Sequence, residues 1–196
     1  MTILALTCSY EAVRAFFYTA IFLILAACQQ PVAAQKPNIE TAKNNDEATL
    51  KLVRSHLETY DEPKAQELLD KIKNKENEDY LNFSGVCADI RAEPAKAQEF
   101  YNAALKLAPD DEAIRNNLAL SYIMAGDPFK GIEILEKLVK SPYTNQKNLS
   151  KYRHNLALGY AMTNKNSLAF QNLVKDLPPQ AAKENLLFYK ALKKGQ

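Results

Sequence analysis

The residues best suited to chemistry are few in this chain and lie far apart. The two histidines, His56 and His154, are about a hundred residues apart, and neither stands beside a second metal ligand at helical spacing or a nucleophile motif. The acidic run Asp110–Glu112 is interpreted as the start of a helix, because acids there bond free backbone amides and face the positive end of the helix dipole. We therefore expect no catalytic residues, no metal site and no enzymatic activity.

The amino-acid composition excludes further classes of function. The five glycines stand alone along the chain, whereas a phosphate-binding loop needs them clustered. The 25 basic and 23 acidic residues give a net charge of +2, too weak a field to attract a polyanion. We therefore expect no cofactor, no nucleic-acid partner and no small-molecule substrate.

The beginning of the chain has the pattern of an export signal. An apolar run from Ala15 to Leu25 follows Arg14, and its length suits a signal peptide rather than a membrane span. It leads into Leu25-Ala26-Ala27-Cys28, which resembles the bacterial lipobox, in which the cysteine thiol receives a diacylglycerol and cleavage occurs just before it. We predict a lipoprotein signal peptide over residues 1–27 and lipidation of Cys28. The alternative is an ordinary secretory signal that ends in a cysteine.

A polar segment follows this predicted cleavage site. Residues 28–45 are rich in Gln, Pro, Ala, Lys and Asn and carry Ile39 as the one large aliphatic residue beyond Val32, which is the composition of a flexible tether. Gln29 is not the aspartate that favours retention in the inner membrane of enteric-type bacteria. We expect a lipid anchor in the outer membrane, on its periplasmic face, and a folded domain over residues 46–193. The inner membrane remains the alternative.

Two segments of the folded domain repeat each other. Asn117–Met124 reads NLALSYIM and Asn155–Met162 reads NLALGYAM, so that six of eight positions agree. Each segment is followed by a turn and a second amphipathic run. After the first segment, Gly126 suits a left-handed helix end, Asp127 suits a cap, and Pro128 suits the first turn of the next helix. The pattern predicts pairs of helices.

The pairs resemble the tetratricopeptide repeat of about 34 residues. Between Asp79 and Asp111 the small, aromatic and proline-stop positions of that repeat are occupied by Gly85, Ala88, Ala97, Tyr101, Ala104 and Pro109. A weaker copy covers residues 46–73, and successive repeats start about 32, 34 and 38 residues apart. We assign the extra residues of the third interval to a loop over Tyr143–Asn148. The resemblance implies an all-α, right-handed superhelix of about four helix pairs, closed by a capping helix after Pro178-Pro179. Cys87 is expected to be buried.

Several sequence segments resemble more specifically the TadD family of tetratricopeptide lipoproteins. The genes of this family are encoded together with those of the Flp (Tad) pilus machinery. The runs are GVCADI from Gly85, AQEFYNAALKLAPDD from Ala97, NNLALS from Asn116, HNLALGY from His154 and ENLLFYKAL from Glu184. Two departures are Gly131, where alanine is usual, and the degenerate first repeat. Membership implies a role in assembling the pilus secretion complex, with the secretin as partner. The alternative is a general envelope lipoprotein that recruits peptidoglycan or outer-membrane assembly factors.

In repeats of this kind the first helix of each pair lines a concave groove that holds a protein partner. The register places in that groove Asn82, Val86, Asp89, Asn116, Leu120, Met124, His154, Leu158 and Met162. Methionine offers an adaptable apolar contact, and asparagine can pair with an extended backbone. The alternative for both methionines is packing against neighbouring repeats. We expect Asn116, Leu120 and Met124 to share one exposed helix face, and His154 to contact a partner or water.

The lipobox generates the first testable prediction. Cys28→Ala removes the thiol that accepts the lipid, so the chain should accumulate in its unprocessed form, whereas the wild type should be processed and partition into the detergent phase as a lipid-anchored protein. Processing is measured by the electrophoretic shift of the full chain in cells, with Cys87→Ala as a control that leaves the lipobox unchanged. Normal processing of the Cys28 variant would contradict the lipoprotein assignment.

Overall fold

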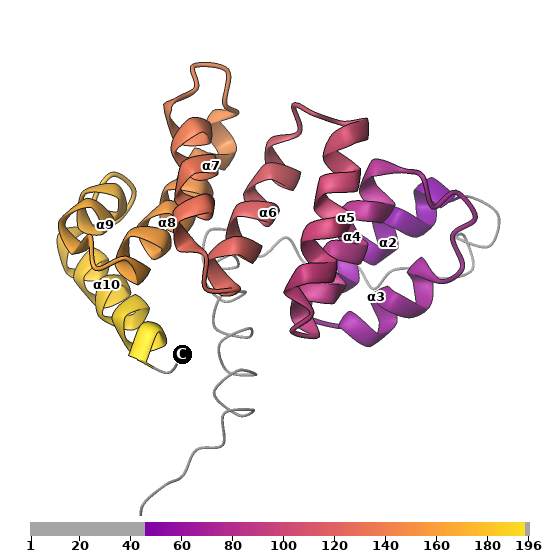
Figure 1. Ribbon diagram of the computed structural model, residues 1–196, viewed down its shortest axis with the longest axis horizontal. Coiled ribbons are helices and arrows are strands. Elements are labelled where there is room, and N and C mark those ends of the chain that lie inside the picture. Colours follow the sequence, from indigo (N-terminus) through magenta and orange to yellow (C-terminus); the bar gives the residue numbers. More distant parts are fainter. Residues whose placement is uncertain (1–45, 195–196) are drawn as a thin grey trace, which may run out of the picture.

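The protein is described by a computed structural model over residues 46–194, and the predicted signal peptide, Cys28 and tether lie outside these described residues. Within residues 46–194 the regular structure is helical (Figure 1). The helices are α2 (Asp46–Glu58), α3 (Glu62–Leu69), α4 (Glu78–Ile90), α5 (Pro94–Leu107), α6 (Glu112–Met124), α7 (Pro128–Lys140), α8 (Gln146–Met162), α9 (Asn166–Leu173) and α10 (Pro179–Lys194). None of these helices has the length and apolar content that crossing a bilayer requires.

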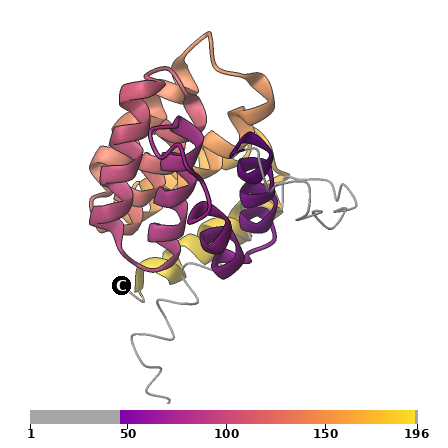
Figure 2. The same ribbon diagram turned by 90° about the vertical axis from the view of Figure 1, so that its right-hand side faces the viewer.

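Consecutive helices form four pairs, which stack in chain order along a curved array (Figures 1 and 2). The first helices also contact one another, α4 against α6 and α6 against α8. The last helix, α10, packs on both α8 and α9 and buries Ala182, Tyr189 and Leu192 in their core. It therefore covers the apolar face that a further repeat would otherwise cover, as the sequence predicts.

The turn inside each pair is three residues long and has a left-handed residue at its centre. The central residues are Tyr60, Ala92, Gly126 and Asn164, with φ of 62°, 60°, 88° and 62°. Gly126 adopts this conformation as predicted, and the cap at Asp127 is confirmed by its side chain, which accepts the Lys130 amide. Tyr60 and Ala92 gave no such signal in the sequence, because residues with a β-carbon rarely adopt positive φ.

Small residues allow the paired helices to approach closely. A β-carbon built on Gly85 would lie 2.6 Å from the Tyr101 ring, so this glycine of α4 leaves the space that the aromatic side chain of α5 occupies. At Gly131 of α7 a β-carbon would lie 2.5 Å from the carbonyl oxygen of Ala119 on α6. Ala97 and Ala119 are fully buried. The small and aromatic positions of the repeat are thus confirmed as contact positions within the second and third pairs.

The extra residues of the third interval extend a helix, and the predicted long loop over Tyr143–Asn148 is wrong. Helix α8 has 17 residues where α6 has 13, and the connection before it comprises only residues 141–145. The longer helix is held against α6, because the Glu112 carboxylate accepts the Asn145 backbone amide at 3.1 Å and the Tyr152 hydroxyl at 3.3 Å. Polar composition alone could not distinguish an added helical turn from a loop.

Overpacking the contact within a pair should be costly. Ala97→Leu and Ala119→Leu place a branched side chain where no space remains, and each should lower the free energy of unfolding by about 1–3 kcal/mol. The measurement is urea denaturation followed by circular dichroism. Ala95→Leu is the matched control, since Ala95 lies in the same helix as Ala97 but is exposed. Equal stability of the Ala95 and Ala97 variants would contradict the assignment.

Candidate functional site

The structure places the nine predicted groove residues deeper than the sequence suggested. Four are half-buried, namely Val86, Asp89, Leu120 and Met124, and five are buried, namely Asn82, Asn116, His154, Leu158 and Met162. The expectation that Asn116, Leu120 and Met124 share an exposed face is wrong. Asn116 is fully buried, and the other two pack against the C-terminal core. The reason is that each first helix contacts the first helix of the next repeat as well as its own pair partner.

Three buried asparagines and the half-buried Asn117 form a hydrogen-bonded ladder between repeats. The Asn117 side-chain amide donates to Oδ1 of Asn82 at 3.0 Å, and the Asn155 amide donates to Oδ1 of Asn116 at 2.8 Å. Asn116 also donates to Oδ1 of Asn117 at 3.4 Å, which joins the two rungs into one path from α8 through α6 to α4. Asparagine suits this role because its amide both donates and accepts. These amides satisfy one another inside the fold.

Two ladder residues, Asn117 and Asn155, were missed as functional positions by the sequence analysis. A signal was present, because each stands directly before the repeated Leu-Ala-Leu and occupies the same place in its repeat. Both hydrogen bonds join neighbouring repeats with the same offset. Counted from the start of each repeat, the donor asparagine stands one position further along than the acceptor asparagine of the preceding repeat. The periodicity shows that the pairing is a property of repeat stacking. Only the packing of α4, α6 and α8 reveals which side chains meet.

Asp89 joins three helices. Its carboxylate accepts the Tyr101 hydroxyl of α5 at 2.9 Å and the Ser121 hydroxyl of α6 at 2.8 Å. Burial raises the pKa of Asp89 to about 7, although both hydrogen bonds act to lower it. The same burial, with the neighbouring Asp89 charge, raises the pKa of Tyr101 well above its ordinary value. Asp89 therefore connects repeats 2 and 3 from within, rather than facing a partner.

His154 is satisfied by its own helix. Its Nδ1 lies 2.8 Å from the carbonyl oxygen of Ser150, one turn earlier in α8, and the residue is buried. The bond occupies Nδ1 only, and the expected contact with a partner or water stays a prediction. Across residues 46–194, no group of histidine, cysteine, aspartate and glutamate side chains is placed to hold a metal ion. Cys87 is buried as predicted, and burial raises its pKa to about 12, which disfavours the reactive thiolate.

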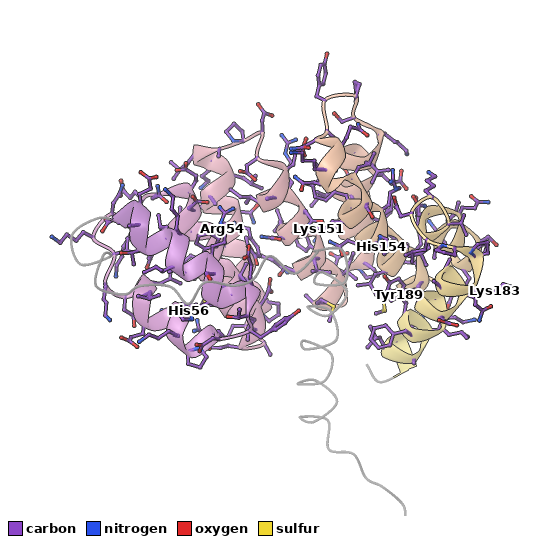
Figure 3. All side chains as sticks on the ribbon, turned by 180° about the vertical axis from the view of Figure 1, so that it is seen from behind. Arg54, His56, Lys151, His154, Lys183 and Tyr189 are labelled. Carbon is purple, nitrogen blue, oxygen red and sulfur yellow. The ribbon has the colours of Figure 1, made fainter. Side chains whose placement is uncertain are left out.

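The inner face, formed by the first helices α2, α4, α6 and α8, also carries accessible charged side chains. Figure 3 shows Arg54 of α2 and Lys151 of α8 on the same side of the molecule. The Arg54 guanidinium lies 3.5 Å from Oδ1 of Asp79 on α4, and its Cζ lies 5.4 Å from the centroid of the Phe83 ring. Burial raises the pKa of Asp79, an effect that Arg54 opposes and that the charges of Glu78 and Asp111 reinforce. Arg54 of α2 thus contacts α4 through both its charge and the Phe83 ring.

Lys151 lies across the inner face from Arg54. Burial lowers the pKa of Lys151, the Glu58 charge acts to raise it and the Arg54 charge acts to lower it, so α2 and α8 are within electrostatic range of each other. The salt bridges among the described residues leave the Lys151 ammonium without a carboxylate within 4.0 Å. A half-buried cation that has no ion-pair partner among the described residues can accept an acidic or carbonyl group of a binding partner. Such a contact contributes binding energy because one of its groups is charged.

Comparisons with known proteins agree with this architecture. No family model and no curated protein sequence matches the chain. Two crystal structures of MamA, a tetratricopeptide-type helical repeat protein, are similar in fold. One aligns with a TM-score of 0.52 and 17% identity over 95% of each chain, and the other with a TM-score of 0.53 and 19% identity over 90% of this chain and 95% of the other. The described chain has a tetratricopeptide-type fold.

The buried Asp89 carboxyl generates a pH-dependent prediction. Its pKa is raised from 3.8 to about 7 on folding, so the folded chain holds the proton more tightly and the stability from Asp89 is present below about pH 4. That stability is lost as the pH rises through about 7. Relative to Asp89→Asn, the wild type should therefore lose about 2–4 kcal/mol of unfolding free energy between about pH 4 and about pH 8.

The measurement is urea unfolding across that pH range. Asp110→Asn is the matched control, because the Asp110 side chain is 96% exposed and its one ion pair is with Arg115. If the Asp89 and Asp110 variants showed the same pH dependence as the wild type, the Asp89 carboxyl would not be responsible.

Proposed function

We propose that this protein is a lipid-anchored envelope adaptor whose tetratricopeptide superhelix binds a segment of a partner protein along its inner face. We further propose that the partner belongs to a Flp (Tad) pilus secretion complex, with the secretin as the first candidate. The protein would act at the periplasmic face of the outer membrane and would bind rather than catalyse. The lipobox and the runs shared with the TadD family support the location and the complex, and the fold supports the binding role.

The observation that carries the binding role is the Lys151 ammonium, which has no carboxylate within 4.0 Å among residues 46–194. Most of the apolar and amide side chains predicted to line the groove are buried in the stacking of the repeats, and Val86, Leu120 and Met124 remain half-buried. Lys151 is half-buried on α8 and faces the charges of Arg54 and Glu58 on α2. A partner acidic group placed there replaces water around a cation that is already partly desolvated, which makes the contact stronger than an exposed pair.

Replacing the lysine tests the binding role. Lys151→Met removes the charge but keeps the length and apolar stem of the side chain, so helicity should be unchanged while partner binding weakens by about tenfold or more. The full chain is used to capture proteins from the cell envelope, the secretin is quantified, and circular dichroism confirms folding. Lys183→Glu is the control for charge, because Lys183 is an exposed residue of α10 at the C-terminal edge in Figure 3.

The outcomes separate the two parts of the proposal. A folded Lys151 variant that captures every wild-type partner at full strength contradicts the inner-face site. A wild-type chain that captures envelope proteins through Lys151 but never the secretin or another pilus component contradicts the pilus assignment and leaves the adaptor role intact.

A further inference from the structure

The positive charge of the described chain is concentrated at its C-terminal end. Residues 163–194, which we call the C-terminal cap, include α9 and α10 and contain six lysines and two acidic residues. Residues 46–162 contain 16 basic and 19 acidic residues. The nearly neutral net charge of the whole chain therefore conceals a basic cap at one end of a slightly acidic array.

The lysines of the C-terminal cap have no acidic partners inside the fold. Over residues 46–162, 11 of the 16 basic side chains lie within 4.0 Å of a carboxylate. Among the described residues, no carboxylate lies that close to the ammonium groups of Lys165, Lys175, Lys183, Lys190 and Lys193. The acids of the cap are engaged elsewhere, since Asp176 pairs with Arg153 of α8. Glu184 accepts a hydrogen bond from Gln180. The charge of these lysines is thus left for solvent or for a partner.

One face of α10 combines such lysines with an exposed leucine. Lys183, Leu187 and Lys190 are spaced four and three residues apart, so they share one face of the helix. All three side chains are exposed, and Leu187 is 65% exposed. The opposite face of α10 is buried against α8 and α9. An exposed leucine alone is common on protein surfaces, but a leucine flanked by lysines is typical of a helix that lies on a lipid surface.

The predicted tether brings a lipid surface within reach of this face. The tether joins the fold at Asp46, where α2 begins, and α2 and α10 lie at opposite ends of the array (Figure 1). Residues 28–45 span at most about 60 Å when fully extended, so an anchor at Cys28 does not by itself determine which part of the fold faces the bilayer. A contact made by the C-terminal cap would determine it.

We propose that the C-terminal cap binds an anionic lipid bilayer, with Leu187 inserted among the headgroups and Lys183 and Lys190 paired with lipid phosphates. A bilayer fits because it presents negative charge over a continuous plane, and the lysines are spread from the start of α9 through the following turn to α10. The apolar stems of the lysines can lie along the interface while their ammonium groups reach the phosphates. The inference rests on the proposed lipid anchor for its setting, and it adds a second membrane contact at the other end of the array.

The test uses residues 29–196, which lack the predicted signal peptide and lipidated cysteine but contain every helix of the described fold. Sedimentation with vesicles of equal parts phosphatidylglycerol and phosphatidylcholine measures the partition coefficient. The wild type should bind these vesicles at least about tenfold more strongly than vesicles of phosphatidylcholine alone. Raising the ionic strength from about 0.1 M to about 1 M should release it, because the Debye length falls.

Variants locate the contact on α10. Lys183→Glu together with Lys190→Glu should weaken binding by about 25-fold or more, because each lysine near an anionic surface contributes about fivefold. Leu187→Ser should weaken binding by about threefold, and circular dichroism should show unchanged helicity in both variants. Lys73→Glu together with Lys75→Glu is the matched control. These two exposed lysines lie between α3 and α4, so the net charge changes equally while binding should stay at the wild-type level.

Equal binding by the two double variants overturns the proposal, because binding then follows net charge and not the α10 face. A wild-type chain that does not distinguish anionic from neutral vesicles also overturns it. If Lys183 and Lys190 were then required to capture an envelope protein, the cap would bind an acidic protein instead.

The inner-face site is tested separately. Lys151→Met should bind vesicles as the wild type does, since Lys151 lies on α8 and outside the cap. The Lys183 and Lys190 double variant should capture partners normally from a detergent-solubilised envelope, where no bilayer is present. Failure of the cap proposal is therefore distinguishable from failure of the adaptor proposal.

Discussion

The fold depends on the close approach of two helices within each repeat. At Gly85 the absence of a β-carbon leaves the space filled by the Tyr101 ring, and at Gly131 it allows α7 to lie against the Ala119 carbonyl of α6. This approach fixes the pair geometry, and the pair geometry repeated four times produces the curvature of the array (Figure 2). Gly131 is thus no weakness of its repeat, because alanine there would meet backbone as well as the Ile123 side chain.

Tight stacking of the pairs removes several polar side chains wholly or partly from water, and hydrogen bonds between helices satisfy those of the asparagine ladder and Asp89. The asparagine ladder links α4, α6 and α8, and the Asp89 carboxylate binds hydroxyls from α5 and α6. A buried polar group without a partner costs free energy, whereas a fully paired network specifies one register of packing. These residues therefore determine how successive repeats stack, and they leave recognition to the side chains that remain accessible.

The accessible side chains form two surfaces that differ in charge and in apolar content. The inner face presents a charged edge, where Arg54 forms an ion pair with Asp79 and Lys151 has no ion-pair partner within the part of the chain that the structure describes. The exposed face of α10 combines Lys183 and Lys190 with the protruding Leu187. A lipid anchor at Cys28 would confine both surfaces to the membrane plane, where even modest contacts become effective because the local concentration is high.

The sequence by itself determined the helix pairs, the caps at Asp111 and Asp127, the left-handed Gly126, the small contact positions and the capping helix, because each depends on local residue preference or on the repeat period. Tertiary structure decided which first-helix residues face a partner. The repeat register places both Asn116 and Lys151 on first helices of their pairs. How deeply each side chain is buried depends on how much of it the neighbouring repeat covers. That coverage buries Asn116 completely and leaves Lys151 half-buried. It is set by the packing of helices distant in the chain, which no local pattern records.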